Sequence, residues 1–358
     1  MRALLLLLVL LTAGGSAAAQ DPGAATRRPP NVILVLVDDM GYGDLSAYGN
    51  TRVRTPNIDR LAREGTRFTQ YYANSPICSP SRVAATTGTY PSRWRIHSFL
   101  EARQRNAARG MADYLDPEAP TLARTLQQAG YATGHFGKWH MGGGRDVGDA
   151  PLPQAYGFDK SITSFEGLGD RYLWHDHLNE QSARLGRGNI RRTEKREMTR
   201  IYVDHAIDFI RQNRDRPFYV NVWPEDVHDP FLPDSALAER YREVARSDYE
   251  KKFFAVLVEM DRQLGRLFDE VDRLGLAEET IIVLTSDNGP TDWPYYYQEG
   301  VQPPGSAGPF RGRKWSLYEG GIREPLIVRW PGRTPAGATD GRTVLAAMDI
   351  LPSLARLA

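Results

Sequence analysis

The sequence predicts an α/β protein with a large, mostly parallel central sheet flanked by helices. Apolar runs occur within residues 31–37, which begin with Asn31, and within 281–285, which end with Thr285, and such runs are typical of strands buried on both faces. Segments with helical signals alternate with strand-like segments along the chain. Strands that alternate with helices form parallel sheets covered on both sides, and this is the basis of the prediction.

The first half of the chain contains two helices with recognisable ends. A helix is expected over 56–64, because Thr55 suits the N-cap and Gly65 follows the last turn. Residues 120–129 show the same pattern of a starting proline and a closing glycine. A short strand is expected directly afterwards, at 131–133.

The second half begins with a polar stretch and continues with regular elements. Residues 160–197 lack periodicity, which predicts excursions over the surface. The elements expected next are a helix over 198–211, a strand over 218–223, a long helix from Phe253 to Leu274 with apolar residues at three- and four-residue steps, the strand at 281–285 and a strand over 326–330. The sequence stops at Ala358 inside a helix that begins near Asp349, so we expect one C-terminally truncated domain over 31–358.

Composition and the N-terminal segment narrow the class of protein. With 45 Lys and Arg against 44 Asp and Glu, the net charge of +1 gives no basis for nucleic-acid binding. Residues 1–19 have a charged start, a short apolar core and small residues before a cleavage site, so they predict a signal peptide and export to the periplasm or extracellular space. Residues 20–30 are expected to be a linker. After it, no apolar run is long enough to span a membrane.

Cys78 is the only cysteine in the chain. Pro80 suits the first turn of a helix, so Cys78 is expected near a helix N-terminus that favours negative charge, with Arg82 one turn further on. The residue is then either a reactive thiolate or a buried core cysteine, the latter being commoner without other support. In an oxidising compartment, a lone thiol is buried, paired between molecules or chemically converted.

Residues with oxygen-bearing side chains directly follow two of the predicted strands. Asp38 and Asp39 follow the first strand, and Asp287 and Asn288 follow the strand at 281–285. Because parallel strands present their carboxyl ends at one edge of a sheet, the four side chains are expected to converge. A hard cation such as Ca²⁺ or Mg²⁺ relieves repulsion between crowded carboxylates and suits these ligands better than Zn²⁺ or copper. Each pair alone could equally be ordinary turn residues.

Several basic residues could serve an anionic substrate. Lys138 and His140 lie two positions apart in a stretch punctuated by glycines, so in extended backbone they face the same side. A lysine and a histidine on one face can bind an oxyanion and move a proton. His228 after a strand and Lys314 in a basic loop are weaker signals alone, and His135 is expected to be structural or exposed. Together with the cysteine and the acidic residues, these groups describe a site for an anionic ester.

Assembled, these blocks resemble the type I sulfatases of the alkaline-phosphatase-like superfamily. The stretch Cys78-Ser79-Pro80-Ser81-Arg82 fits the C-x-P-x-R maturation motif of that family. Further matching blocks, in the family's order, are Asp38-Asp39-Met40-Gly41-Tyr42-Gly43-Asp44, Thr55-Pro56-Asn57-Ile58-Asp59, Gly137-Lys138-Trp139-His140 and Ser286-Asp287-Asn288-Gly289. A single block could arise by chance, whereas the whole set, which runs nearly from Asn31 to the end of the chain, is highly specific.

The resemblance implies a modified residue, a metal ion and roles for the basic residues. It implies that a formylglycine-generating maturation enzyme oxidises Cys78 to formylglycine. The calcium ligands it implies, with Mg²⁺ less favoured, are Asp38, Asp39, Asp287, Asn288 and the formylglycine at position 78. It also implies that Arg82 supports the formylglycine hydrate, that Lys138 binds sulfate, and that Lys314 and His228 bind sulfate and assist the departing oxygen.

The reaction implied by the resemblance is hydrolysis of a sulfuric ester with release of inorganic sulfate. A hydroxyl of the formylglycine hydrate attacks sulfur, and calcium lowers the pKa of that hydroxyl. Sulfate then leaves by elimination when His140 takes the proton of the other hydroxyl. The expected substrate is a sulfated carbohydrate, with aryl sulfates as artificial substrates.

Some assignments stay open at this point. A hydroxyl from the middle segment contacts sulfate in the family, and Ser161 and Ser164 are the candidates. Candidate substrate contacts are Arg95, His97, Trp174, His175, His177, Trp293, Tyr295, Tyr296 and Tyr297. The family's small C-terminal subdomain is expected to be missing beyond Ala358. The alternative functions are a phosphate or phosphonate ester hydrolase of the same superfamily and a catalytically silent, secreted glycan-binding relative with an unmodified Cys78.

Overall fold

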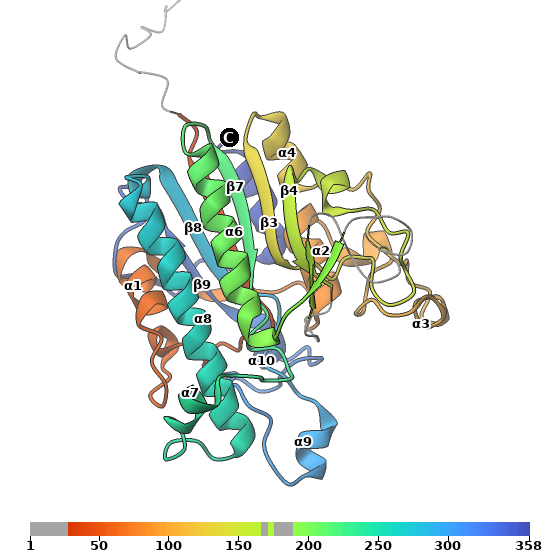
Figure 1. Ribbon diagram of the computed structural model, residues 1–358, viewed down its shortest axis with the longest axis vertical. Helices are drawn as coiled ribbons and strands as arrows, with labels where there is room; N and C mark the ends of the chain where they lie inside the picture. The colour runs from red at the N-terminus through yellow and green to blue at the C-terminus, as the bar shows by residue number, and fades with distance from the viewer. Residues whose placement is uncertain (1–27, 166–170, 175–188) are drawn as a thin grey trace, which may run out of the picture.

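The computed structural model describes residues 28–165, 171–174 and 189–358 (Figure 1). The expected signal peptide at 1–19 and most of the expected linker lie outside the described residues. In the described part, one sheet of 11 strands has the order β10-β2-β9-β8-β1-β7-β3-β4-β5-β6, and β11 pairs with β2. No helix in this part combines the length and the apolar character needed to cross a membrane.

The strands are β1 (Asn31–Val37), β2 (Thr66–Tyr72), β3 (Ala132–Lys138), β4 (Lys160–Ser164), β5 (Arg171–Trp174), β6 (Asn189–Arg192), β7 (Phe218–Trp223), β8 (Thr280–Ser286), β9 (Arg323–Arg329), β10 (Ala338–Asp340) and β11 (Leu345–Ala346). The α-helices are α1 (Pro56–Glu64), α2 (Cys78–Thr87), α3 (Arg103–Ala108), α4 (Leu122–Gln128), α6 (Met198–Asn213), α7 (Ser235–Glu239), α8 (Asp248–Arg273), α9 (Pro294–Gln298), α10 (Glu319–Ile322) and α11 (Ile350–Ala355).

The centre of the sheet is parallel. Strands β8, β1, β7, β3 and β4 run in one direction, whereas β9 is antiparallel to β8 and β2, and β5 and β6 are antiparallel additions at the far edge. The prediction of a mostly parallel sheet flanked by helices is confirmed. Strands β1 and β8 stay in register as far as the pair Val37 and Ser286, so they end at the same level. The residues that follow the two strands therefore meet.

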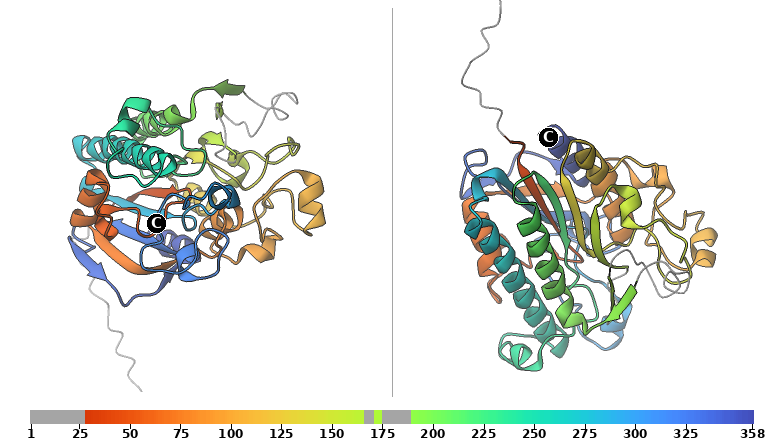
Figure 2. Two further views of the ribbon diagram at one scale, coloured as in Figure 1. Left: turned by 90° about the horizontal axis from the view of Figure 1, so that it is seen from below. Right: turned by 45° about the horizontal axis from the view of Figure 1, so that its top comes forward.

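Residues of β1 alternate between two hydrophobic cores, one on each face of the sheet. Ile33, Val35 and Val37 pack in the core beneath α1, α6 and α8, of which α6 and α8 lie in front of the sheet in Figure 1. Leu34 and Leu36 belong to the core shared with α2, α4 and α11 on the other face (Figure 2). Burial of each such side chain stabilises the fold by about 1.5–3 kcal/mol. This double burial explains why the strand has an uninterrupted apolar sequence.

Most elements lie where the sequence predicts them. The strands expected at 31–37, 218–223, 281–285 and 326–330 and the helices expected at 56–64, 198–211 and from 253 to 274 are all present to within a few residues. The helix expected over 120–129 is shorter, because Thr121 is its N-cap and accepts a hydrogen bond from the backbone N–H of Arg124 at 3.2 Å. The long helix begins earlier than expected, where Ser247 caps the N–H of Glu250.

Two predictions around β3 and β4 are wrong. The strand expected at 131–133 extends through Lys138, so the first part of the stretch punctuated by glycines, up to Lys138, is a buried strand. Gly137 makes this possible, since its φ is 135° and a Cβ there would approach the carbonyl oxygen of Trp223 on β7 to 2.1 Å. Within the stretch 160–197, expected to be surface excursions, the described residues include the strands β4, β5 and β6, while residues 166–170 and 175–188 lie outside the described part. Strands β5 and β6 lie at the end of the sheet, with β6 as the edge strand, where an uninterrupted apolar pattern is not required.

The N-terminus of α1 is satisfied differently from the prediction. Thr55 makes no side-chain cap, and its Oγ1 accepts a hydrogen bond from the N–H of Ser46 at 3.1 Å instead. The carboxylate of Asp261 on α8 accepts from the backbone N–H groups of Asn57 at 3.2 Å and Ile58 at 2.8 Å. A residue distant in sequence thus supplies the cap, and a local pattern cannot reveal it.

Candidate active site

The candidate site is built on the carboxyl ends of β1 and β8. Asp38 and Asp39 follow β1, and Asp287 and Asn288 follow β8. The backbone N–H of Asp39 donates to Asp287 Oδ1 at 3.1 Å, and Asn288 Nδ2 donates to Asp39 Oδ1 at 2.8 Å. Asp39 has a left-handed φ of 59°, which turns its carboxylate back into the cluster. The structure thus brings together the four side chains that follow the two strands.

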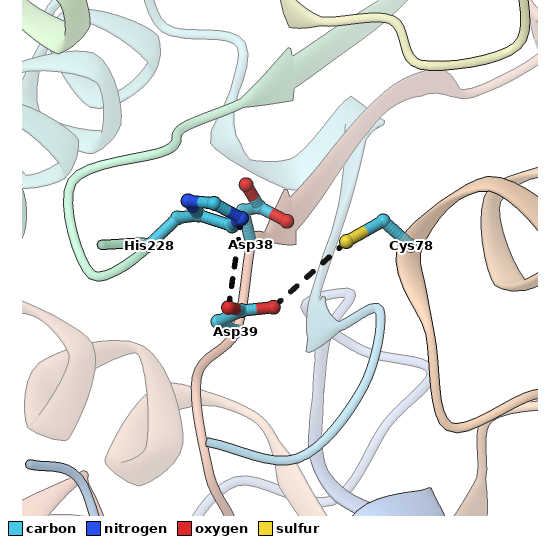
Figure 3. A group of neighbouring side chains, drawn as sticks. All are labelled: Asp38, Asp39, Cys78 and His228. Carbon is cyan, nitrogen blue, oxygen red and sulfur yellow. Dashed lines mark hydrogen bonds and ion pairs between the residues drawn. The ribbon is translucent and has the colours of Figure 1, made fainter. Parts of the chain in front are cut away.

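Cys78 is the first residue of α2 and is 2% exposed. Its Sγ lies 3.9 Å from Asp39 Oδ1, and Figure 3 shows both pointing into the same group of side chains. Burial raises the pKa of the thiol to about 12, although Lys138 and Lys314 oppose the shift. The interpretation of Cys78 as a low-pKa thiolate activated by a helix N-terminus is therefore wrong. Burial thus favours the neutral thiol form of an unmodified cysteine at this position.

Arg82, fully buried one turn after Cys78, ties the two strand ends together. Its Nε donates to Asp287 Oδ2 at 2.9 Å, and its Nη2 donates to Asp38 Oδ1 at 3.1 Å. Its Nη1 donates to the carbonyl oxygen of Lys138 at 3.0 Å, and its guanidinium lies 5.3 Å from the ring centre of Trp223. The planar fork of arginine suits such a bridge between carboxylates. Arg82 therefore fixes the positions of Asp38 and Asp287.

Two buried lysines face the aspartates that follow β1. Lys138 Nζ lies 2.6 Å from Asp38 Oδ2, and Lys314 Nζ lies 2.7 and 2.6 Å from the two carboxylate oxygens of Asp39. Burial opposes ionisation of Asp38, but Lys138, with His228 and Arg82, outweighs it and holds the pKa well below its usual value. At Asp39, burial raises the pKa of the carboxyl group by more than the charge of Lys314 lowers it, so the pKa is above its usual value. Asp38 is thus the more strongly ionised carboxylate of the two.

Both histidines of the site are buried and neutral. His228 Nδ1 lies 2.6 Å from the carbonyl oxygen of Asp229, so Nδ1 carries the proton, while Nε2 lies 3.7 Å from Asp39 Oδ2 (Figure 3). His140 Nε2 lies 3.3 Å from the carbonyl oxygen of Leu100 and carries the proton in that contact. Burial lowers the pKa of both rings well below the usual value. Each ring therefore keeps one nitrogen that can accept a proton.

These groups border a cavity of about 60 Å³. It is lined by Ile77, Cys78, Phe99, His140, Arg145, His228, Trp293, Lys314 and Trp315. A cavity of this size, with a lysine and two histidines in its wall, is suited to one small tetrahedral oxyanion.

The donor atoms fit a hard divalent cation. One ligand atom from each of Asp38, Asp39, Cys78 and His228 lies within 4.8 Å of the others. Asn288 Oδ1 is buried and has no hydrogen-bond partner among the described residues. Carboxylate and amide oxygens are the ligands that Ca²⁺ and Mg²⁺ prefer. An orphaned amide oxygen beside two buried carboxylates is what a cation at this position would satisfy.

The sequence did not indicate which residues hold the turn that carries His228. Asp229 Oδ2 accepts hydrogen bonds from the hydroxyl groups of Tyr295 and Tyr296, the latter at 2.6 Å. Lys195 is 4% exposed, and its ammonium donates to carbonyl oxygens at both ends of the turn from residue 228 to residue 230. Tyr295 and Tyr296 were candidates for substrate contact, whereas their hydroxyls are engaged with Asp229. Both contacts link segments distant in sequence, so no local pattern indicates them.

The two candidate serines are occupied by protein contacts. Ser164 Oγ donates to the carboxylate of Glu225, and Ser161 Oγ accepts from Gln154 Nε2 at 3.3 Å. Neither serine lines the cavity next to Cys78. The assignment of a sulfate-binding hydroxyl to either residue stays a prediction.

The other candidates for substrate contact differ in whether they lie at the cavity. Trp293 lines the cavity. Arg95 lines a different hollow, together with Arg93 and Trp94, and the hydroxyl of Tyr297 binds Asp292 at 2.6 Å. His97 is exposed. His175, His177 and the side chain of Trp174 lie outside the described part of the structure.

Comparison with known proteins agrees with the geometry. A family model described as sulfatase matches residues 30–358. The chain belongs to the sulfatase family. Mouse steryl-sulfatase is one of the relatives found by sequence, and it is 32% identical to this chain. The alignment covers 92% of this chain and 62% of the length of the steryl-sulfatase. The N-acetylgalactosamine-6-O-sulfatase of Bacteroides thetaiotaomicron is 30% identical over 91% of this chain and 72% of its own length.

The fold is shared with sulfatases of known structure. A sulfatase from Pseudoalteromonas sp. is 28% identical and superposes with a TM-score of 0.72, covering 92% of this chain and 68% of that chain. This chain spans between 58% and 72% of the length of the similar sulfatases found by sequence. The matched region includes both strand ends and the Cys78 motif, since it begins at residue 30.

Proposed function

We propose that the protein is a sulfuric ester hydrolase that releases inorganic sulfate from a sulfated carbohydrate. The observation that carries this proposal is the cavity beside Cys78, into which a buried lysine and two neutral histidines project next to a cluster of carboxylates. A sulfate ester has one negative charge and a tetrahedral group of matching size. Similarity to an N-acetylgalactosamine-6-O-sulfatase supports a carbohydrate as the rest of the substrate.

The residues present fit the two groups that the family implies. Cys78 would be converted to formylglycine, which accounts for a buried thiol that is unreactive as it stands. Calcium would be held by Asp38, Asp39, Asp287, Asn288 and residue 78. When bound, the two groups supply a hydrated aldehyde as nucleophile and a cation that lowers its pKa.

The lysines bind and orient the sulfate group in this proposal. Lys314 lines the cavity, and its Nζ is held against Asp39, so its ammonium is fixed in position before substrate arrives. Lys138 is fixed in the same way by Asp38. Because burial is outweighed by these carboxylates, the pKa of each lysine is raised and both remain charged. Preorganised charges in a site without bulk water stabilise an anionic transition state most effectively.

Proton movements are assigned to the remaining cavity residues. His140 is neutral, and its Nδ1 is buried without a hydrogen-bond partner among the described residues, so it can take a proton when sulfate is released. Lys314 donates a hydrogen bond to the departing alcohol oxygen. His228 borders the same space, with its Nδ1–H held by the carbonyl oxygen of Asp229 and its Nε2 as the nitrogen that accepts a proton.

Export and maturation belong to the same proposal. Residues 1–19 would direct the chain to the periplasm or extracellular space, and a formylglycine-generating enzyme would act on Cys78 first. Mass spectrometry of the peptide that contains Cys78, taken from the natural host, tests this step. Formylglycine at position 78 supports the proposal, and an unmodified thiol contradicts it and leaves a glycan-binding protein as the better alternative.

The activity is tested with the matured protein and a panel of substrates. Sulfate release is measured by ion chromatography from defined sulfated saccharides and from an aryl sulfate, with phosphate mono- and diesters as matched controls. We expect sulfate release from at least one sulfated saccharide and slower cleavage of the phosphate esters. Cleavage of phosphate esters without any sulfate release would favour the phosphoesterase alternative.

The identity of the metal is tested by removing it. After treatment with a chelator, we expect lower thermal stability, because a metal ion that binds only the folded protein stabilises it by mass action. Calcium is expected to restore the melting temperature at lower concentration than magnesium, since its coordination geometry is more tolerant. Recovery with magnesium alone would overturn the calcium assignment while leaving the metal site in place.

A further inference from the structure

Backbone strain marks residues around the cavity that the reaction does not use. In the described part of the chain, the non-glycine residues with positive φ are Asp39 at 59°, Arg95 at 55°, His140 at 50°, Arg145 at 51° and Trp315 at 69°. Such conformations cost about 1–3 kcal/mol each and cluster at functional sites. Three of these five residues line the cavity beside Cys78, and Asp39 lies against Cys78 and Lys314. Arg145 and Trp315 therefore have the same left-handed backbone conformation as Asp39 and His140, two residues of the proposed active site.

Trp315 follows Lys314 directly and forms one wall of the cavity mouth. Its backbone N–H donates to the carbonyl oxygen of Pro76 at 2.8 Å, which holds the strained residue in place. Its ring meets that of Trp293 edge to face, with centroids 4.8 Å apart and planes at 77°. Trp315 is 37% exposed, and Lys314 Nζ lies 5.8 Å from its ring centre. An apolar aromatic surface thus stands beside a cation assigned to sulfate.

Arg145 reaches the same cavity from the segment that follows β3. Its side chain is 41% exposed, and its Nη1 lies 3.4 Å from Glu101 Oε1. Glu101 is only 4% exposed and also contacts Arg105 at 3.2 Å and Arg109 at 3.1 Å. Of these three arginines, Arg145 is the one that lines the cavity, so it presents a positive charge at the cavity wall. A guanidinium binds carboxylate or sulfate oxygens through two parallel hydrogen bonds.

We propose that Arg145 and Trp315 form a specificity subsite for an acidic sugar. The ring that carries the scissile sulfate packs against Trp315, and Arg145 binds a second anionic group on that sugar or the adjoining one. This second group is a carboxylate or another sulfate, which present the same oxygen chemistry to the guanidinium. The inference rests on the proposed function and names its substrate class. The preferred substrate is a sulfated saccharide with at least two negative charges.

The decisive experiment compares substrates and two arginine variants. Sulfate release by matured wild-type, Arg145→Gln and Arg95→Gln proteins is measured on three saccharides of equal length: one with a single sulfate, one with two, and one with a sulfate and a uronic acid. Arg95 is the matched control, because it has the same strained backbone but lines another hollow. The two dianionic substrates distinguish a carboxylate from a second sulfate.

We expect Arg145→Gln to lower kcat/KM by roughly 10- to 100-fold on a dianionic substrate and by less than about 3-fold on the monosulfated one, as for loss of a charge-assisted hydrogen bond. Arg95→Gln should leave kcat/KM on all three saccharides within about 2-fold of the wild-type value. Equal losses on all three substrates would mean that Arg145 acts only through the fold, which overturns the proposal. Absence of sulfate release by wild type on every substrate would instead contradict the proposed function.

Binding measurements separate recognition from turnover. In a Cys78→Ala background, calorimetry should show tighter binding of the dianionic saccharide than of the monosulfated one, and Arg145→Gly should abolish this preference. Glycine suits the left-handed backbone, so this variant removes the guanidinium without adding strain. Trp315→Ala should weaken the binding of both saccharides by about 5- to 50-fold. Substitution of another exposed aromatic residue, Tyr318→Ala, should leave the binding of both unchanged. Unchanged preference in Arg145→Gly would overturn the assignment.

Discussion

Charged pairs at the carboxyl edge of the sheet differ from those on the outer face of α8. Arg82 contacts Asp38 at 3.1 Å and Asp287 at 2.7 Å, and all three side chains are fully buried. Arg262 contacts Glu259 at 2.6 Å, with side chains 60% and 27% exposed. Exposed pairs contribute about 0–1 kcal/mol, whereas removing one partner of a buried pair costs about 3–5 kcal/mol. The difference shows that the fold retains charges at the sheet edge in spite of their desolvation cost.

That cost indicates chemistry at the sheet edge. A hydrophobic replacement of a buried ionic cluster is often neutral or stabilising, so packing alone does not require Arg82, Lys138 and Lys314 at this position. The pairs on α8 need no such explanation, because they remain in contact with water. The following predictions test this contrast, from the largest expected effect to the smallest.

Cys78→Ala should abolish turnover, with a loss on the order of 10⁴-fold or more, as expected when a nucleophile is removed. The acidic cluster should still form, since Asp39 keeps its contacts with Lys314 and Asn288. Sulfate release and calorimetric titration with Ca²⁺ measure the two properties separately. Substantial turnover by this variant would rule out the proposed mechanism.

Arg82→Met should lower the free energy of unfolding by about 3–5 kcal/mol, because Asp38 and Asp287 are left buried without their bridge. The matched variant on α8, Arg262→Met, should change it by less than about 1 kcal/mol. Urea unfolding followed by circular dichroism measures both. Similar small losses in the two variants would show that the buried cluster is held by other groups.

His135 offers a buried but uncharged comparison within the same sheet. It lies on β3 among Trp139, Phe158 and Trp223, and burial lowers its pKa to about 3. Because this folded-state pKa lies below the usual value of 6.5, the contribution to stability is complete above pH 6.5 and is lost as the pH falls toward 3.

His135→Gln removes this titration. From pH 7.5 to pH 5, wild type should lose about 2 kcal/mol more of its free energy of unfolding than the variant does. Urea unfolding of both proteins at the two pH values measures the difference. A parallel pH dependence of the two proteins would show that His135 does not titrate with unfolding in this range.

Tyr296→Phe tests the hydrogen bonds that position His228. The variant removes one donor to Asp229 and should lower kcat by up to about 10-fold with little change in KM, as for loss of one hydrogen bond to a charged group. Tyr297→Phe is the matched control, since its hydroxyl binds Asp292 instead. A change of KM alone would indicate substrate binding by Tyr296 and not positioning of His228.

Much of the framework is readable from the sequence, because buried elements have local signatures. The strands at 31–37 and 281–285 are buried on both faces, so every position except Asn31 and Thr285 is apolar and the pattern is clear. The residues that follow them are constrained by parallel pairing, which places Asp38 and Asp287 at one edge. Cys78 at a helix start follows from Pro80 in the same way.

Only the tertiary structure decides how those residues behave. Helix position alone suggested an ionisable thiol at Cys78, but complete burial dominates and raises its pKa. Lys195, Asp229 and Tyr296 act on His228 through contacts between segments distant in sequence, and Arg145 and Trp315 meet at one cavity in the same way. The sequence by itself thus determined the family motifs and the strand ends. Desolvation and long-range contacts, which depend on every packed neighbour, determined charge states, orientation and the wall of the pocket.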